Sequence, residues 1–183
     1  MRCFGEGDAL YEPYHDTEWG RPQRTTQQLY EKICLEGMQA GLAWITVLRK
    51  REAIREVFGG FDPAYVVGLD IEPLLADARL IRARAKLQAC VTNARAVLEL
   101  DASGTDLVEL IWSYRLDGPA PTSWSDVPAT TPASVELAKT LKRKGFVFVG
   151  PTTVYSLLQA CGVVNDHLAG CRVRDEVEVA RQV

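Results

Sequence analysis

Helical periodicity in nearly every segment is the feature that most constrains how this chain folds. Four apolar residues with spacings of four, three and four predict one buried stripe on a helix over residues 82–100: Leu87, Val91, Ala94 and Leu98. The only strand-like run covers residues 146–149, which is too short and isolated to build a sheet. We therefore predict an all-α fold. The length of the chain suits one domain or two small subdomains that share a core, and we expect residues 1–183 to form one unit of two helical subdomains that share a cleft.

Capping signals mark where several helices begin and end. Thr25 and Gln28 resemble a capping box at the start of a helix that we expect Gly37 and Gly41 to interrupt. Thr105 is the expected cap of a later helix. Asp62-Pro63 predicts an N-cap followed by proline at the first helical position. Further helices are expected over residues 42–58, 134–144 and 151–161, and a long surface loop over residues 117–132.

The composition is that of an ordinary globular protein with nearly balanced charges. The chain has 47% hydrophobic and 25% charged residues and a formal charge of −3. This balance argues against a protein that coats nucleic acid without specificity, but it allows a local basic patch. No apolar run approaches the ~20 residues that span a bilayer, and the first residues lack the apolar stretch of a signal peptide. We expect a cytoplasmic protein without membrane contact, monomeric in the simplest case.

Cysteine and histidine residues gather near both ends of the chain. Cys3 and His15 lie near the start, and His167 and Cys171 lie near the end with the spacing of one helical turn. Two thiolates and two imidazoles are the ligands of a closed, structural zinc site. The spacing alone leaves two alternatives open, a metal site or four unrelated residues. The other cysteines lie in helical segments and are expected to be core residues: Cys34, Cys90 and Cys161.

The segment LKRKGFVFVGPTTVYSLLQACG combines a basic helix end, an apolar turn between two glycines, and a new helix. Gly150 allows a DNA backbone to approach closely, and the free N–H groups of the helix that starts at Pro151 can bind a phosphate. The basic residues before Gly145 add attraction that does not depend on base sequence. The pattern fits a helix-hairpin-helix motif, and it also fits an ordinary corner between two helices.

Glu36 is a carboxylate within an otherwise apolar run, ICLEG. Burial of a carboxylate is costly, so one alternative is that Glu36 points to solvent. The other is that it faces an aromatic pocket, where a flipped purine stacks on Trp44 and hydrogen-bonds to Glu36. Three more aromatic residues cluster near the first Cys–His pair: Tyr11, Tyr14 and Trp19. The other tryptophans are assigned to the core and to the polar loop, respectively: Trp112 and Trp124.

Segments along nearly the whole chain resemble, in order, the constitutive type of bacterial 3-methyladenine DNA glycosylase. They are RC, YHDTEWG, ICLEGMQAGLAWITVLRKR, FDP, LIRARAKLQACVTNARA, LKRKGFVFVGPTTVYSLLQACG and VNDHLAGC. The resemblance implies a helix-hairpin-helix glycosylase fold and a monofunctional enzyme of base-excision repair that removes 3-methyladenine from double-stranded DNA.

The resemblance also implies roles for individual residues. Glu36 would hydrogen-bond the base on its exocyclic amine side, and Trp44 would stack on it. The remaining residues are implied, by role, to line the base pocket (Tyr14, Trp19 and Tyr11), to bind one structural zinc ion (Cys3, His15, His167 and Cys171) and to contact DNA (Lys144, Gly145, Gly150 and Thr152).

Phe4 departs from the family pattern. The family usually has a tryptophan shortly after the first cysteine, whereas Phe4 follows Cys3 here in a segment that is one residue shorter. A phenyl ring stacks over a smaller face, so one rival interpretation is a glycosylase with a different preference among alkylpurines. The other rival is a non-catalytic, zinc-containing module that binds damaged DNA.

A 3-methyladenine nucleotide is cationic, so its base leaves as a neutral molecule without a general acid. The expected work of the protein is to extrude the base, exclude adenine and let the sugar develop positive charge near water. No lysine is marked as a nucleophile by the sequence. Gln39 and Leu42, before Trp44, are the candidates for filling the gap in the duplex.

Overall fold

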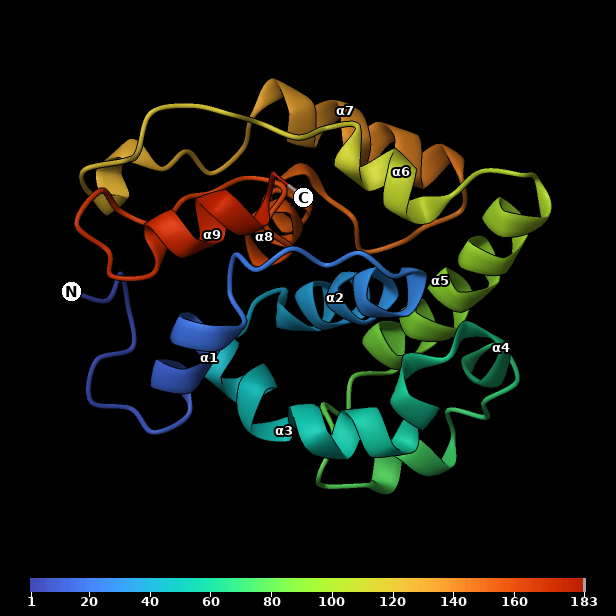
Figure 1. Cartoon of the computed structure of the whole chain (residues 1–183). Coiled ribbons are helices and arrows are strands. Elements are labelled where there is room, and N and C mark those ends of the chain that lie inside the picture. Colours follow the sequence, from blue (N-terminus) through green and yellow to red (C-terminus); the bar gives the residue numbers. More distant parts are fainter. Residues whose placement is uncertain (183) are drawn as a thin grey trace.

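The computed structural model describes residues 1–182, and every regular element in that range is helical. The central helix α2 (Thr26–Gln39) packs against α3 (Trp44–Val57), α5 (Arg84–Ala102) and α8 (Pro151–Ala160) (Figure 1). α7 (Pro132–Arg143) packs in turn on α8. The predicted all-α class is confirmed. The shorter elements are α1 (Tyr11–Thr17), η1 (Gly59–Phe61), α4 (Pro63–Val66), η2 (Pro73–Ala76), α6 (Leu107–Trp112), η3 (Trp124–Asp126) and α9 (Arg174–Ala180).

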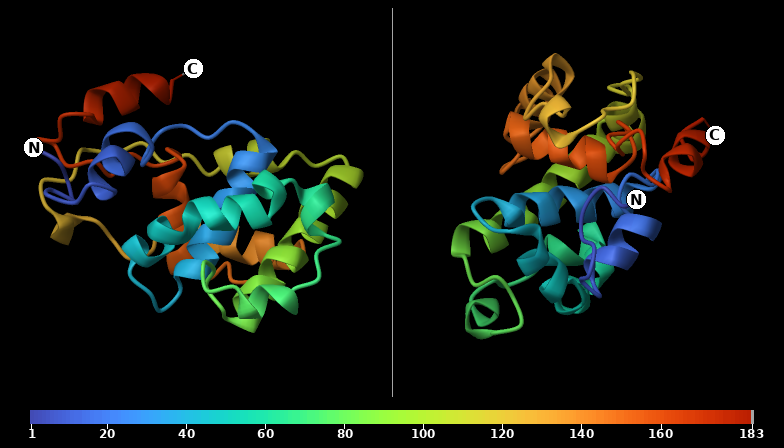
Figure 2. Two further views of the ribbon diagram at one scale, coloured as in Figure 1. Left: turned by 90° about the horizontal axis from the view of Figure 1, so that it is seen from below. Right: turned by 90° about the vertical axis from the view of Figure 1, so that its left-hand side faces the viewer.

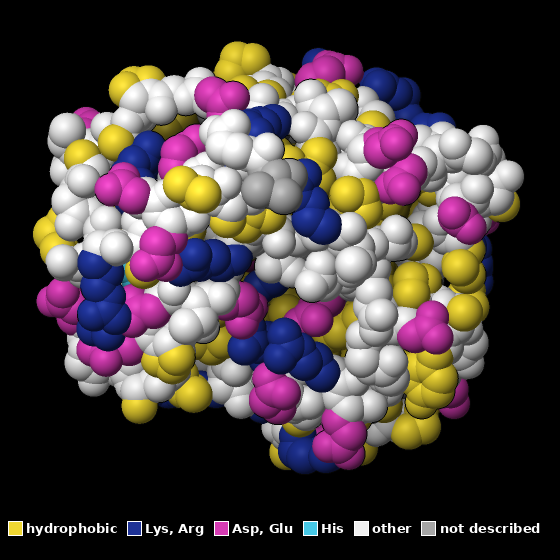
Figure 3. All heavy atoms as spheres, in the orientation of Figure 1, with side chains coloured by type: hydrophobic (Ala, Val, Ile, Leu, Met, Phe, Trp, Pro, Cys, Tyr) yellow, Lys and Arg dark blue, Asp and Glu magenta, His cyan; other side chains and the backbone are white. Residues whose placement is uncertain are grey.

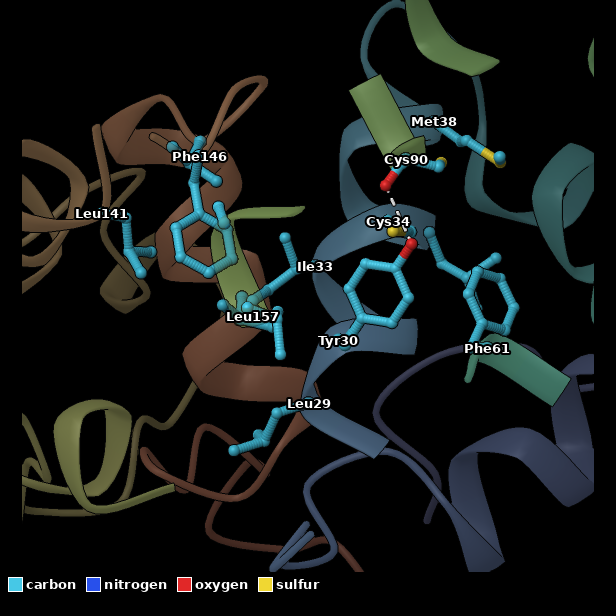
Figure 4. Packing of buried hydrophobic residues seen from close by; sticks show 14 of the residues in the cluster. Leu29, Tyr30, Ile33, Cys34, Met38, Phe61, Cys90, Leu141, Phe146 and Leu157 are labelled. Atoms are coloured by element: carbon cyan, nitrogen blue, oxygen red, sulfur yellow. Dashed lines mark hydrogen bonds between the residues drawn. The ribbon is translucent and has the colours of Figure 1, made fainter. Parts of the chain in front are cut away.

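The amphipathic sequence of α2 places this helix in the middle of the core. Its predicted capping box is confirmed, since the Thr25 and Gln28 side chains each bond the backbone of the other residue. Ile33 of α2 lies near Phe146 and Leu157 in the main apolar cluster, where each large side chain contributes about 1.5–3 kcal/mol (Figure 4). The buried Tyr30 hydroxyl donates to the Cys90 carbonyl oxygen at 2.8 Å (Figure 4).

Several sequence predictions differ from the structure in detail. Gly37 does not interrupt α2, which continues to Gln39 because tertiary packing on both sides outweighs the low helix propensity of glycine. α6 is capped by Asp106 and not by Thr105, since the Asp106 carboxylate accepts from two backbone N–H groups. Leu98 is exposed, because the end of α5 packs against α6 and buries Val97 and Leu100 instead. By contrast, residues 146–149 form a turn between helices and no strand, as the apolar turn predicted between the two glycines requires.

The N-terminal residues lie beside the segment that precedes α9 near the other end of the chain, as Figures 1 and 2 show. The Arg172 backbone N–H donates to the Met1 carbonyl oxygen at 3.1 Å. The apolar cluster here is small and separate from the main core: Cys3, Leu168, Cys171 and Val173. Because so few apolar side chains contribute little burial energy, polar contacts add to the cohesion of these segments, such as the ion pairs of Arg2 and Arg172 with Asp16.

Charged side chains of both signs are interspersed on the face seen in Figure 3, as the balanced composition leads one to expect. Many form ion pairs across elements, such as Arg21 with Glu176 at 2.8 Å. None of the helices in residues 1–182 combines the length and the apolar character that crossing a membrane requires.

Candidate functional site

A pocket of about 220 Å³ opens where α1, α2, α3 and α8 meet. This volume suits a single nucleobase better than a drug-sized ligand, which needs about 300–1,000 Å³. Five of the lining residues were predicted to meet the base, together with Glu36: Phe4, Tyr11, Tyr14, Trp19 and Trp44. The structure therefore brings the predicted pocket residues together. Four further residues complete the lining: Gln39, Trp124, Ser156 and Gln159.

Glu36 is the carboxylate of this pocket. It is 5% exposed, so the alternative in which it points to bulk solvent is wrong. Burial raises the pKa of Glu36 to about 7, against a smaller lowering by the positive charge of Lys32. No group in residues 1–182 donates a hydrogen bond to the Glu36 carboxylate. A buried carboxylate that lines a cavity without a donor is poised to accept hydrogen bonds from a ligand.

A buried ion-pair network lies behind the pocket. Lys32 precedes Glu36 by one turn of α2 and donates to the Glu18 carboxylate. Arg51 of α3 also donates to Glu18, at 2.5 and 2.6 Å. The Lys32 ammonium lies 5.3 Å from the centre of the Tyr14 ring. This network was missed by the sequence analysis, because its partners come from three separate helical segments.

Aromatic rings form most of the pocket wall. The Phe4 ring lies 5.1 Å from the Trp19 ring and 5.7 Å from the Tyr11 ring, centre to centre. Tyr14 lies 5.4 Å from Trp44, the first residue of α3. The indole Nε1 of Trp44 is buried and has no hydrogen-bond partner in the described chain. Flat π faces with an unsatisfied donor and acceptor match a planar, polar-edged ligand.

The predicted metal ligands converge at the joined chain ends. The ligand atoms of Cys3, His15, His167 and Cys171 all lie within 4.8 Å of one another. Three sulfur–nitrogen separations are 3.4, 3.4 and 3.5 Å, close to the roughly 3.6 Å expected when zinc holds both atoms tetrahedrally. Burial lowers the pKa of His15 and of His167 to about 4, which keeps both imidazoles neutral and able to bind a metal.

A second layer of contacts orients the two imidazoles. Nδ1 of His15 lies 2.9 Å from the Asp16 carboxylate, which leaves its Nε2 facing Cys171. Nε2 of His167 lies 3.1 Å from the Trp19 carbonyl oxygen, which leaves Nδ1 facing both sulfurs. Such partners are typical of metal-binding histidines. Because Trp19 also lines the pocket, the cluster and the pocket share a structural element.

The α7–α8 connection is a rigid turn. Gly145 has φ +89°, and its N–H donates to the Lys142 carbonyl while the Phe146 N–H donates to the Leu141 carbonyl. These two bonds form the Schellman pattern, which is common where a glycine ends a helix. From α5, the buried Asn93 amide holds both the N–H and the carbonyl of Val147, at 2.8 and 3.1 Å. Asn93 was missed, because an amide inside an apolar helix pattern gives no sign of its partner.

A groove of about 200 Å³ joins the first turn of α8 to the pocket, with which it shares Glu36, Gln39 and Ser156. It is also lined by Thr152 and Thr153 from the first turn of α8, and by Leu42 from the α2–α3 connection, which is 38% exposed. An extended ligand that lies in the groove therefore passes from the N-terminus of α8 to the mouth of the pocket. Trp124 lies in the loop where the sequence analysis placed it, but its contribution to the pocket lining was missed, since its polar, proline-rich context indicated only a surface loop.

Comparisons with known proteins extend over nearly the whole chain. A family model described as methyladenine glycosylase matches residues 4–175. DNA-3-methyladenine glycosylase 1 of Escherichia coli (strain K12) is 49% identical over 170 residues, which is 90% of this chain and 91% of that protein. DNA-3-methyladenine glycosylase of Haemophilus influenzae is 48% identical over 177 residues, 93% of this chain and 96% of that protein.

Solved structures give the same result. A crystal structure of 3-methyladenine DNA glycosylase I superposes with a TM-score of 0.90 at 46% identity, covering 94% of this chain and 98% of that chain. A variant of 3-methyladenine DNA glycosylase I, solved in complex with 3-methyladenine, gives a TM-score of 0.87 at 34% identity and covers 94% of this chain and 96% of that one.

Proposed function

The chain belongs to the methyladenine glycosylase family, and from this membership we propose that it hydrolyses the N-glycosidic bond of 3-methyladenine in alkylated double-stranded DNA. The observation that carries the proposal is the pocket itself. Glu36 lines an aromatic cavity of nucleobase size with its carboxylate buried and unpaired. Such a site accepts a base that has left the duplex, because the edge of the base hydrogen-bonds to the unpaired carboxylate and the faces of the base stack on the aromatic rings.

Glu36 and Trp44 are the proposed readers of the base. Glu36 accepts a hydrogen bond from the exocyclic amine, and its negative charge favours the cationic alkylated nucleotide over neutral adenine. Trp44 stacks on the base, and Phe4, Tyr11, Tyr14 and Trp19 complete the wall. This selection acts before and during bond cleavage, since the positive charge is present in the substrate and lost from the product.

The proposed reaction is a monofunctional hydrolysis. The electron pair of the glycosidic bond passes to the cationic base, which leaves neutral, while water adds to C1′ of the sugar and loses a proton to solvent. No general acid is needed, and the described pocket lining contains no lysine that would form a covalent adduct. The contribution of the protein is therefore extrusion, orientation and electrostatic selection.

We propose that Cys3, His15, His167 and Cys171 hold one structural zinc ion. The donor set, the separations and the two second-layer contacts support this assignment. Four protein ligands leave no open position for water, so the ion would supply no chemistry to the reaction. Its role would be to join the ends of the chain and thereby position Phe4 and Trp19 at the pocket.

We further propose that the α7–α8 unit is a helix-hairpin-helix motif whose DNA contacts include Lys144, Gly145, Gly150 and Thr152. The Schellman turn at Gly145 and the groove from Thr152 to the pocket support it. The division into two subdomains, the monomeric state and the gap-filling role of Gln39 or Leu42 stay predictions.

Gly150 offers a clean test of the DNA contact. An added Cβ at Gly150 meets no atom within 4 Å, and the backbone φ of −67° suits alanine. We expect Gly150→Ala to change the free energy of unfolding by less than about 1 kcal/mol and to weaken DNA binding about tenfold, because the methyl group blocks N–H···phosphate bonds of about 1.5–3 kcal/mol. Gly118→Ala, at an equally open glycine, is the matched control. Equal DNA affinity for both variants in a fluorescence anisotropy titration would place the contact elsewhere.

The activity is tested by incubating the protein with methylated DNA and separating the released bases by chromatography. We expect 3-methyladenine as the main product. Release of a different purine would favour the rival in which Phe4 alters the choice of alkylpurine. Binding of methylated DNA without any base release would favour the non-catalytic module.

A further inference from the structure

Trp124 lies at the pocket although it belongs to a segment far from the other lining residues. It is the first residue of η3, in the connection between α6 and α7, and it is 43% exposed. Its ring lies 6.3 Å from Phe4 and 6.1 Å from Trp19, centre to centre. These contacts make Trp124 an extension of the Phe4–Trp19 part of the wall.

The position of Trp124 is held from two directions. Its indole N–H donates to the Cys3 carbonyl oxygen at 2.8 Å. Within its own segment, one Asp126 oxygen accepts from the N–H and hydroxyl of Thr122 and from the Ser123 N–H, at 2.7–2.9 Å. The Ala169 N–H also donates to the Pro121 carbonyl oxygen at 2.8 Å, which ties the segment to the C-terminal part of the chain. The ring is therefore presented by a fixed turn.

We propose that Trp124 contacts the flipped base and helps to determine which alkylpurines the pocket accepts. This inference rests on the proposed function and adds a specificity-determining residue to the same site. Phe4 offers only one benzene ring on its side of the pocket, whereas an indole adds a larger face. An indole is also the aromatic face that attracts a cation most strongly, so it favours a cationic alkylated base over a neutral one.

Trp124→Leu removes the aromatic face and keeps apolar bulk. We expect it to weaken binding of free 3-methyladenine about tenfold or more, as loss of a base–aromatic stack does. We also expect a lower ratio of 3-methyladenine to 7-methylguanine among the bases released from methylated DNA, because a wider pocket discriminates less. Trp124→Phe keeps a ring but loses the bond to Cys3, so it should retain most of the preference if the aromatic face is what matters.

Trp112→Phe is the matched control. Trp112 donates its indole N–H to the Gln23 carbonyl oxygen at the same 2.8 Å and does not line the pocket. We expect its base affinity and product ratio to match those of the wild type. Metal content and melting temperature are measured for every variant, and binding is titrated by intrinsic fluorescence or calorimetry on metal-loaded protein.

The outcomes separate the two proposals. If the wild type releases no alkylated base, the proposed function fails. If the wild type releases 3-methyladenine but metal-loaded Trp124→Leu keeps the same base affinity and product ratio, only the role of Trp124 is overturned. If both Trp124 variants lose metal yet bind the base normally once the metal is restored, Trp124 only stabilises the position of Cys3 and the inference is wrong.

Discussion

Glu36→Gln is expected to slow release of 3-methyladenine by about a hundredfold or more, while making the protein more stable at pH 8. The loss of activity follows from removing a negative charge opposite a cationic base in a buried site, where one such interaction is worth 10²–10³ in rate. Single-turnover release from methylated DNA measures this loss. Retained excision in the variant would exclude Glu36 from the role proposed here.

The pH dependence of the wild type provides a second readout. The alkylated nucleotide is already cationic, so the ionised form of Glu36 is the active one. Since the pKa of Glu36 is raised to about 7, kcat/KM should increase as the pH rises through about 7 and then level off. The Glu36→Gln variant should show a flat and low profile, because glutamine does not titrate.

The gain in stability arises because glutamine, unlike ionised glutamate, carries no buried charge at pH 8. A raised pKa means that the folded state binds the proton of Glu36 more tightly than the unfolded state does. The contribution of Glu36 to stability is thus fully present below about pH 4.5 and is lost as the pH rises through about 7. Glutamine avoids that loss, and Lys32 keeps its ion pair with Glu18. We expect a gain of about 1–3 kcal/mol at pH 8, or several degrees in Tm, and none near pH 4.5.

Thermal melts at pH 4.5 and 8 test this gain, with Glu99→Gln as the control because Glu99 is an exposed glutamate on α5. A Glu36→Gln variant that is destabilised at pH 8 would show that the ionised carboxylate is not the costly group. The outcome as expected would identify Glu36 as a residue kept for function at the expense of stability.

Local signals predicted the helices well, because caps and turns depend on neighbouring residues. The capping box of Thr25 and the Asp62 cap both involve partners within three residues. Thr105 failed as a cap because Asp106, one residue later, offers a carboxylate to the same helix. Leu98 failed because periodicity identifies a face of α5 but not where the neighbouring helices end.

The site was predictable only in part, because many of its contacts join residues that are far apart in the sequence. The family resemblance assigned Glu36 and the N-terminal aromatic residues to one pocket, but two residues at or beside that pocket, Lys32 and Trp124, have no local sequence signal. Lys32 has the sequence context of a surface lysine, yet it is 3% exposed, because its charge is neutralised by the Glu18 carboxylate, to which Arg51 also donates. Trp124 reads as part of a loop, and it reaches the pocket through a bond to Cys3 at a distance of 121 residues along the chain.

The metal cluster gives the other large expected effect. Among the described residues, the apolar cluster at the joined chain ends has four buried members, Cys3, Leu168, Cys171 and Val173. We therefore expect the proposed zinc ion to supply most of the energy that joins these segments. Zinc binding in small metal-dependent folds is worth on the order of 10 kcal/mol. We expect Cys171→Ala to lose the metal, to lower Tm by more than about 10 °C and to weaken base binding, because Phe4, Trp19 and Trp124 are all held by this cluster.

Cys161→Ala distinguishes loss of a ligand from loss of a buried sulfur. Cys161 is fully buried in the main core, so its replacement costs about 1 kcal/mol through lost packing and leaves the metal content at one ion per chain. Metal content by mass spectrometry and melts with and without a chelator make the comparison. If Cys171→Ala retains a full complement of zinc, or if a chelator leaves the wild-type Tm unchanged, the four residues do not form a structural metal site. If chelation lowers Tm and base affinity together in the wild type and in Cys161→Ala but not in Cys171→Ala, the ion is what couples the chain ends to the pocket.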